Sequence, residues 1–176
     1  MKNSILTAAA LCAVLFSGSA IAGDFGGAYV GGDISFSKAD FGASDDDGFA
    51  GGIFIGTGKQ YGKWYVGGEI GAGLSSVDDN TAGIEQKNYY DATMRVGYVP
   101  NEKVMGYGLV GLQGGQFKTA AGTDSDYGFT FGAGVETFVK QNISLRTEIK
   151  YTDWQGENGL SNDSELKTTA KLAYRW

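Results

Sequence analysis

The residues of this 176-residue chain that are able to do chemistry are charged side chains placed at alternating positions. Carboxylates and amines in such a set either transfer protons as acid–base pairs or neutralise one another as ion pairs. Histidine is absent, which excludes nucleophilic catalysis by serine–histidine or cysteine–histidine pairs and removes the commonest neutral general base and metal ligand. The candidates are Asp33, Glu69, Asp91, Arg95, Glu136, Arg146, Glu148, Lys150 and Lys171.

Acids and bases are interleaved in this set, and that favours neutralisation over catalysis. Nearby bases keep a carboxylate ionised, which makes it a poor general acid. We therefore predict no catalytic residue, no cofactor and no metal site, and we interpret the set as a network of ion pairs. A small ion-conducting, porin-like path through this network is the alternative, and an enzyme built on carboxylates without histidine is the least favoured.

The composition excludes several other classes of protein. The chain holds 30 glycines, one proline and 13% aromatic residues, and its net charge is −6 with a pI near 4.6. The glycines have no three-residue period and the aromatic content is high, so neither collagen nor disorder fits. The chain is acidic and lacks the excess of basic residues that nucleic-acid binding requires, and we therefore expect no nucleic-acid partner.

The first 22 residues have the three regions of a secretory signal peptide. Lys2 gives a positive start, residues 5–16 are almost entirely apolar, and Ala20 and Ala22 are the small residues of a cleavage site. The apolar run is too short to span a membrane as a helix. We predict cleavage after Ala22, which leaves residues 23–176 as one domain without cysteine, because the single cysteine, Cys12, is removed.

From residue 25 onward, apolar and polar residues alternate with the period of two that is typical of β-strands. In the first run, Val30 and Ile34 fall on one face, and Tyr29, Asp33 and Ser35 on the other. No segment has the stripe of an amphipathic helix, so the predicted class is all-β. The predicted strands cover residues 25–37, 48–58, 63–75, 88–99, 103–116, 126–139, 142–154 and 164–176.

The connections between these strands alternate in length. Longer polar stretches cover residues 38–47, 76–87, 117–125 and 155–163, whereas residues 59–62, 100–102 and 140–141 form short turns. This alternation is typical of an eight-stranded antiparallel up-and-down transmembrane β-barrel with short periplasmic turns and longer extracellular loops. In such a barrel we expect the charged set to point inward and to plug the lumen as a network of salt bridges.

The apolar face favours a membrane barrel over a soluble one. It carries many small residues, among them Gly32, Gly68 and Ala92, which would pack poorly as a core but are acceptable against lipid. Aromatic residues fall near the strand ends of the same face, where interfacial girdles lie. They are Tyr90, Tyr98, Tyr127, Tyr151, Tyr174 and Trp176.

The last strand alternates up to an aromatic carboxy-terminal residue, with Tyr174 and Trp176 on its apolar face. This resembles the signal that outer-membrane barrels present to their insertion machinery, with tryptophan in place of the usual phenylalanine. Together with four internal patterns, it makes the chain similar to the eight-stranded outer-membrane β-barrel family of the OmpA and opacity type. The patterns are residues 28–32 (AYVGG), 66–71 (VGGEIG), 132–136 (GAGVE) and 145–153 (LRTEIKYTD).

The resemblance implies Sec-type export and a place in the outer membrane of a Gram-negative bacterium. It also implies contact with outer-membrane lipid and lipopolysaccharide, insertion by the barrel-assembly machinery, and a monomer. We expect a structural or surface-interaction protein whose acidic loops face outward and are where a host or surface ligand would bind. Asp45, Asp46 and Asp47 offer oxygen ligands for a divalent cation, but an ordinary acidic turn is favoured over a site.

Overall fold

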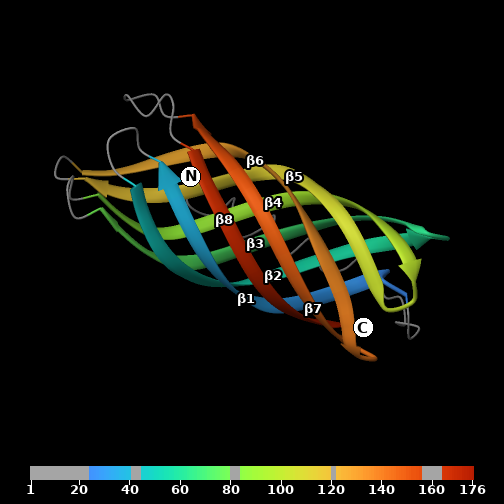
Figure 1. The fold of residues 1–176 in the computed structure, drawn as a ribbon. Coiled ribbons are helices and arrows are strands. Elements are labelled where there is room, and N and C mark those ends of the chain that lie inside the picture. Colours follow the sequence, from blue (N-terminus) through green and yellow to red (C-terminus); the bar gives the residue numbers. More distant parts are fainter. Residues whose placement is uncertain (1–23, 41–44, 80–83, 120–121, 156–163) are drawn as a thin grey trace, which may run out of the picture.

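The computed structural model describes residues 24–40, 45–79, 84–119, 122–155 and 164–176. Their eight strands form one closed antiparallel barrel in sequence order, as predicted (Figure 1). No helix in these ranges is long and apolar enough to cross a membrane. The strands are β1 (Gly27–Asp40), β2 (Asp45–Tyr61), β3 (Trp64–Asp79), β4 (Ile84–Asn101), β5 (Val104–Thr119), β6 (Gly122–Lys140), β7 (Ile143–Gln155) and β8 (Ser164–Arg175).

The pairing of β1 with β8 closes the barrel. Tyr29 lies opposite Arg175 and Asp40 opposite Ser164, so the first strand is paired along most of its length on both sides. A closed sheet leaves no row of unpaired N–H and C=O groups, which is what a strand needs in order to lie in hydrocarbon.

The predicted strand boundaries were too short at the end opposite the tight turns. Strand β2 begins at Asp45 rather than at residue 48, and Lys38 of β1 pairs with Asp47. Backbone hydrogen bonds continue where the alternation of apolar side chains has already stopped, because ladder pairing does not depend on lipid contact. Much of the first three predicted loops is therefore strand, whereas only residue 155 of the fourth is. The remainder, residues 41–44, 80–83, 120–121 and 156–163, lies outside the described residues.

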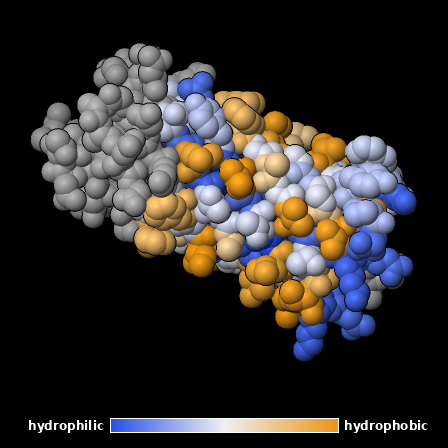
Figure 2. Space-filling model, viewed as in Figure 1, coloured by the Kyte–Doolittle hydropathy of each residue, from blue (hydrophilic) through white to orange (hydrophobic). Residues whose placement is uncertain are grey.

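The predicted inward and outward faces are confirmed. Val30, Ile34, Ile70 and Leu172 point outward and are exposed, and so are the aromatic residues predicted for the girdles. Figure 2 shows hydrophobic residues over the middle of the molecule and hydrophilic residues gathered at the end away from the grey atoms. The exposed apolar residues thus lie on the outer face of the barrel, as contact with lipid requires.

Inward tyrosines explain much of the glycine content. The ring of Tyr29 lies against Gly56 of β2, Tyr65 lies against Gly67, and Tyr107 lies against Gly134 of β6. A Cβ atom built on any of these glycines would overlap the ring, so the tyrosines lie flat on the inner wall only because the wall has no side chain there. The abundance of glycine therefore serves the inside of the barrel as well as the lipid face.

Gly56, which faces the lumen, and Gly106, which faces outward near the start of β5, give a test of this packing. We expect Gly56→Ala to lower the free energy of unfolding by about 1–3 kcal/mol, since the new methyl group displaces the Tyr29 ring. Gly106→Ala, where a Cβ atom meets nothing within 4 Å, should leave it unchanged or raise it slightly. Urea unfolding in lipid vesicles measures both, and equal effects of the two substitutions would contradict the account.

Candidate functional site

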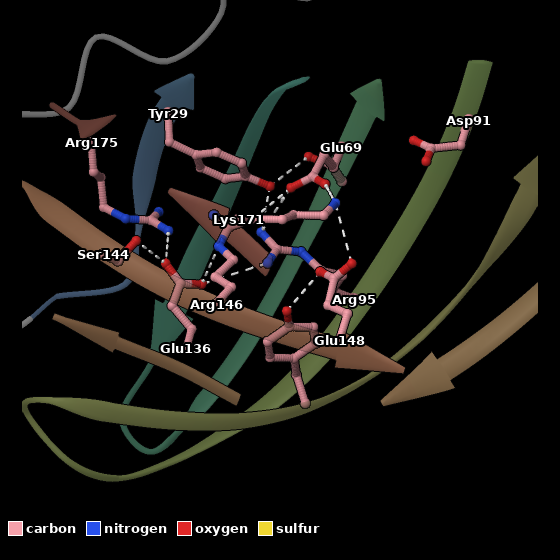
Figure 3. Close-up of polar contacts among 12 residues, drawn as sticks. Tyr29, Glu69, Asp91, Arg95, Glu136, Ser144, Arg146, Glu148, Lys171 and Arg175 are labelled. Atoms are coloured by element: carbon pink, nitrogen blue, oxygen red, sulfur yellow. Dashed lines mark hydrogen bonds and ion pairs between the residues drawn. The ribbon is translucent and has the colours of Figure 1, made fainter. Parts of the chain in front are cut away.

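The centre of the barrel interior holds a carboxylate with three cations around it. Glu69 of β3 accepts a hydrogen bond of 2.6 Å from Nη1 of Arg146 on β7 and another of 2.6 Å from Nζ of Lys171 on β8. Nη2 of Arg95 on β4 lies 3.7 Å from the same carboxylate. All of these side chains are buried (Figure 3).

A second carboxylate, Glu136 of β6, shares two of these cations. Nε of Arg146 lies 3.0 Å from its Oε2 atom, and Nη1 of Arg95 lies 3.5 Å from the same oxygen. Nη2 of Arg175 lies 3.1 Å from Oε1, and the Ser144 hydroxyl donates to Oε1 at 2.6 Å. Arg95 and Arg146 thus each bridge Glu69 and Glu136, which joins β3, β4, β6 and β7 across the lumen.

Glu148 of β7 extends the central cluster on one side. Its Oε2 atom lies 3.2 Å from Nζ of Lys171, and its Oε1 atom accepts a hydrogen bond of 2.7 Å from the Tyr107 hydroxyl. Lys171 therefore bridges Glu69 and Glu148 as the arginines bridge Glu69 and Glu136.

Aromatic rings complete the cluster. The guanidinium carbons of Arg146, Arg175 and Arg95 lie 4.4, 4.6 and 5.1 Å from the centre of the Tyr29 ring. Arg95 also donates to the hydroxyls of Tyr29 and Tyr65. The ring faces thus stabilise three like charges packed close together. The roles of these tyrosines were not predicted, although the alternation of residues places them on the inward face.

A second layer of charges lies farther along the strands, away from the tight turns. Nζ of Lys150 lies 3.2 Å from Asp91, and Nζ of Lys167 lies 3.0 Å from Glu165. Asp33 accepts a hydrogen bond of 2.9 Å from the Tyr89 hydroxyl. Charge pairing therefore continues beyond the central cluster.

All nine charged residues singled out in the sequence point into the barrel, and eight of them contact an opposite charge. Asp33 is bound by Tyr89 and lies opposite Lys171 in the ladder. Three further inward charges, Glu165, Lys167 and Arg175, were not among the candidates, because the candidate set covers only the middle of the strands. The alternation of the last strand gives these three residues the same inward parity. With them, the described inward residues comprise six acids and six bases.

The end of the lumen nearest the tight turns is filled by apolar side chains around Phe25. We had predicted Phe25 as the first residue of a strand, but β1 begins at Gly27, whose φ of 94° turns the preceding residues inward. The carbonyl of Phe25 accepts a hydrogen bond from Arg175, and its ring centre lies 4.7 Å from that of Phe138. The buried residues around it are Tyr65, Val99, Met105, Tyr107 and Leu109.

The chemistry open to this interior is limited by how fully its carboxylates are engaged. Glu69, Glu136 and Glu148 each contact at least two donors or cations. Among the residues that the structure describes, no group of three or more acids, cysteines or histidines is placed to hold a metal ion. The side chains of Asp45, Asp46 and Asp47 lie outside the described part, as do Ala20 and Ala22 of the predicted cleavage site.

A closed barrel with an apolar outer surface and a charged interior defines an integral membrane β-barrel. The chain belongs to the family described as outer membrane protein beta-barrel domain, whose model matches residues 8–173. It is accordingly a protein of the Gram-negative outer membrane.

Relatives and a solved structure support this assignment. The chain is 37% identical to a 22 kDa outer membrane protein of Rhizobium leguminosarum bv. viciae over 144 residues, which cover 78% of this chain and 68% of the relative. It is 33% identical to a 25 kDa outer-membrane immunogenic protein of Brucella canis, with coverage of 78% and 67%. The structure of Ail of Yersinia pestis in complex with the heparin analogue sucrose octasulfate matches with a TM-score of 0.62 at 19% identity, covering 86% and 99%, and shares the fold.

The central cluster predicts that substitutions of two different glutamates have very different effects on stability. Glu69→Ala should lower the free energy of unfolding by about 3–5 kcal/mol, because it leaves Lys171 and Arg146 without their nearest acid in a buried place. Glu102→Ala removes an exposed glutamate in a turn and should have almost no effect. Denaturant unfolding monitored by the gel shift between folded and boiled protein measures both, and similar midpoints would contradict the network.

Proposed function

We propose that this protein is a closed, non-enzymatic outer-membrane scaffold that presents its loops at the cell surface. The observation that carries the proposal is the pair of buried arginines, Arg95 and Arg146, each bridging Glu69 and Glu136 across the lumen. An eight-stranded barrel is just wide enough for side chains to fill. A bridge between opposite walls at this width leaves no free path for ions.

Two barriers in series support the closed state. The charged layer resists opening because separating its ions leaves buried charge uncompensated. The apolar layer around Phe25 resists the entry of water and ions at the end of the tight turns. An open pore would require both layers to rearrange, which distinguishes this interior from that of a porin.

The engagement of the carboxylates supports the absence of enzymatic activity. A general acid or base needs a proton-transfer position open to substrate. Glu136 is instead held by Arg146, Arg175 and Ser144, and it is fully buried. The names of the relatives, which describe outer-membrane immunogenic proteins, are consistent with a role at the surface.

The charge of the loop-bearing end indicates which kind of ligand this protein would bind at the cell surface. Acids outnumber bases over residues 38–47, 76–87 and 155–163, so this end repels polyanions and attracts cations. Ail was solved with a heparin analogue, and the acidic stretches here disfavour a ligand of that kind. We infer that a host or surface ligand of this protein is neutral, cationic or bridged by a divalent cation.

We infer that the barrel-assembly machinery inserts this barrel through its carboxy-terminal strand, and that the barrel is a monomer among outer-membrane lipid and lipopolysaccharide. Tyr174 and Trp176 point outward, and their rings stack at 6.4 Å. We infer that this outward aromatic pair is the assembly signal, and that residues 1–22 are the signal peptide of Sec-type export.

Planar-bilayer recording tests the closed state. The wild-type barrel should show no steady conductance steps, and neither should Phe25→Ala, because the charged layer remains. Phe25→Ala combined with Glu69→Ala should admit ions, since both layers are then weakened. Stepwise conductance of the wild type, with ion selectivity altered by Glu136→Lys, would contradict the proposal and identify a small channel.

Deletion of residues 172–176 tests the role of the last strand. Residues 29–32 of β1 pair with residues 172–175 of β8, so the deletion leaves β1 with an unpaired edge in the bilayer. We expect failure to assemble in cells, read as loss of the heat-modifiable band. A control that replaces Tyr174 by Phe keeps the pairing and should assemble, and normal assembly of the deleted protein would overturn the inference.

A further inference from the structure

Four exposed lysines stand at the end of the barrel that carries the tight turns. They are Lys59, Lys63, Lys103 and Lys140, and we call them the lysine collar. They lie at the three hairpins that join β2 to β3, β4 to β5 and β6 to β7. Figure 2 shows the hydrophilic residues of this end next to the hydrophobic band. In an outer-membrane barrel, the end with short turns faces the periplasm.

The backbone holds two of these turns against the following hairpin. The amide of Val99 donates to the carbonyl of Lys63 at 2.8 Å, and the amide of Phe138 donates to the carbonyl of Lys103 at 2.9 Å. These bonds fix the turns relative to one another, so the collar is a preformed arrangement. Since neighbouring strands lie about 4.8 Å apart, lysines on successive hairpins are spaced on the order of 10 Å apart along the rim.

The collar lies at the level of the lipid headgroups. Lys59 points outward on the same face of β2 as Ile53 and Ile55. Its ammonium lies 5.3 Å from the centre of the Tyr61 ring. Beside it, the rings of Trp64 and Tyr98 pack edge to face at 5.4 Å. Outward tryptophan and tyrosine mark the boundary between hydrocarbon and headgroups. Lys59 lies opposite Val66, one outward position inside these rings, and its ammonium extends to the Tyr61 ring. Its aliphatic stem therefore lies against the apolar surface while its charged end reaches the headgroups.

Exposed lysines outnumber exposed acids at this end among the residues that the structure describes. Against four exposed lysines there is one exposed acid, Glu102, and Asp24 at the same end is half-buried, with its carboxylate accepting a hydrogen bond from the Gly26 amide. The lumen acids are already engaged with lumen cations, so they do not neutralise the collar. The acidic stretches of the sequence belong to the opposite end. An arc of cations at headgroup level, beside an apolar wall, is complementary to an anionic amphiphile.

We propose that the lysine collar selects anionic phospholipids, such as phosphatidylglycerol, from the periplasmic leaflet around the barrel. The phosphate of the lipid lies against the ammonium groups, and the acyl chains cover the adjacent outer face. Phosphatidylethanolamine fits less well because its own ammonium is repelled by the collar. A basic residue near a membrane surface strengthens binding to anionic lipid by about fivefold, so four together give a marked preference.

Electron paramagnetic resonance of spin-labelled lipids tests the proposal on the full-length protein in vesicles. The measurement gives the share of each lipid that is immobilised at the barrel surface. We expect phosphatidylglycerol to be immobilised several-fold more strongly than phosphatidylcholine, with the preference falling as salt is added. A wild-type protein that shows no such preference, or one that salt does not reduce, overturns the proposal.

Two sets of variants separate charge from structure. Replacing all four lysines by glutamine (K59Q, K63Q, K103Q and K140Q) should remove the preference, and replacing them by arginine should retain it. Glu102→Gln should leave it unchanged or raise it. The proposal is overturned if the glutamine variant keeps the wild-type preference, or if the arginine variant loses it although it folds.

The same variants test whether the lysine collar binds peptidoglycan instead of lipid. Purified peptidoglycan sacculi are mixed with the wild type and with the glutamine variant, and bound protein is measured after sedimentation. The proposal expects no difference between the two. Sacculus binding that the glutamine variant loses, together with an unaltered lipid preference, would assign the collar to the cell wall and overturn the lipid proposal.

Discussion

The structure depends first on the need to satisfy every backbone N–H and C=O group within the hydrocarbon of the membrane. Strands meet this need only by pairing on both edges, and β1 with β8 completes the circle. Closing the sheet with eight strands leaves an interior no wider than the side chains that fill it. The outer face must then be apolar, and polar residues are confined to the lumen and the ends.

That confinement explains the composition of the lumen. Charged side chains removed from water are stable only when opposite charges and hydrogen-bond donors surround them. Glu136 meets this condition through three arginines and a serine hydroxyl, and the arginines in turn lie over the Tyr29 ring. The ring itself needs a wall without a side chain, which Gly56 supplies. Glycine, tyrosine, arginine and glutamate are therefore linked members of one packing arrangement.

The sequence was sufficient to predict the strand number, the inward face and nine of the lumen charges, because a period of two and a charge on the polar face are local properties. It did not reveal that Phe25 turns inward, since this depends on the backbone of Gly27 and on a hydrogen bond from Arg175, 150 residues away. The sequence also did not predict which base contacts Glu69. Partners across the lumen depend on the register of the strands and on the length of the side chains, and neither can be read from local alternation. The start of β2 at Asp45 was not predicted, because the alternation of apolar and polar residues ends where the strand leaves the lipid.

The lumen contacts join residues that are far apart along the chain. Glu69 and Lys171 are separated by 102 residues, and Arg175 reaches the carbonyl of Phe25 across 150. None of these partners meets until the first and last strands are side by side. A partly formed sheet would therefore hold its charges uncompensated beside lipid, which makes intermediates with an open seam costly. Neutralisation of the interior charges thus requires a complete sheet, and folding of this barrel is expected to be a single cooperative event.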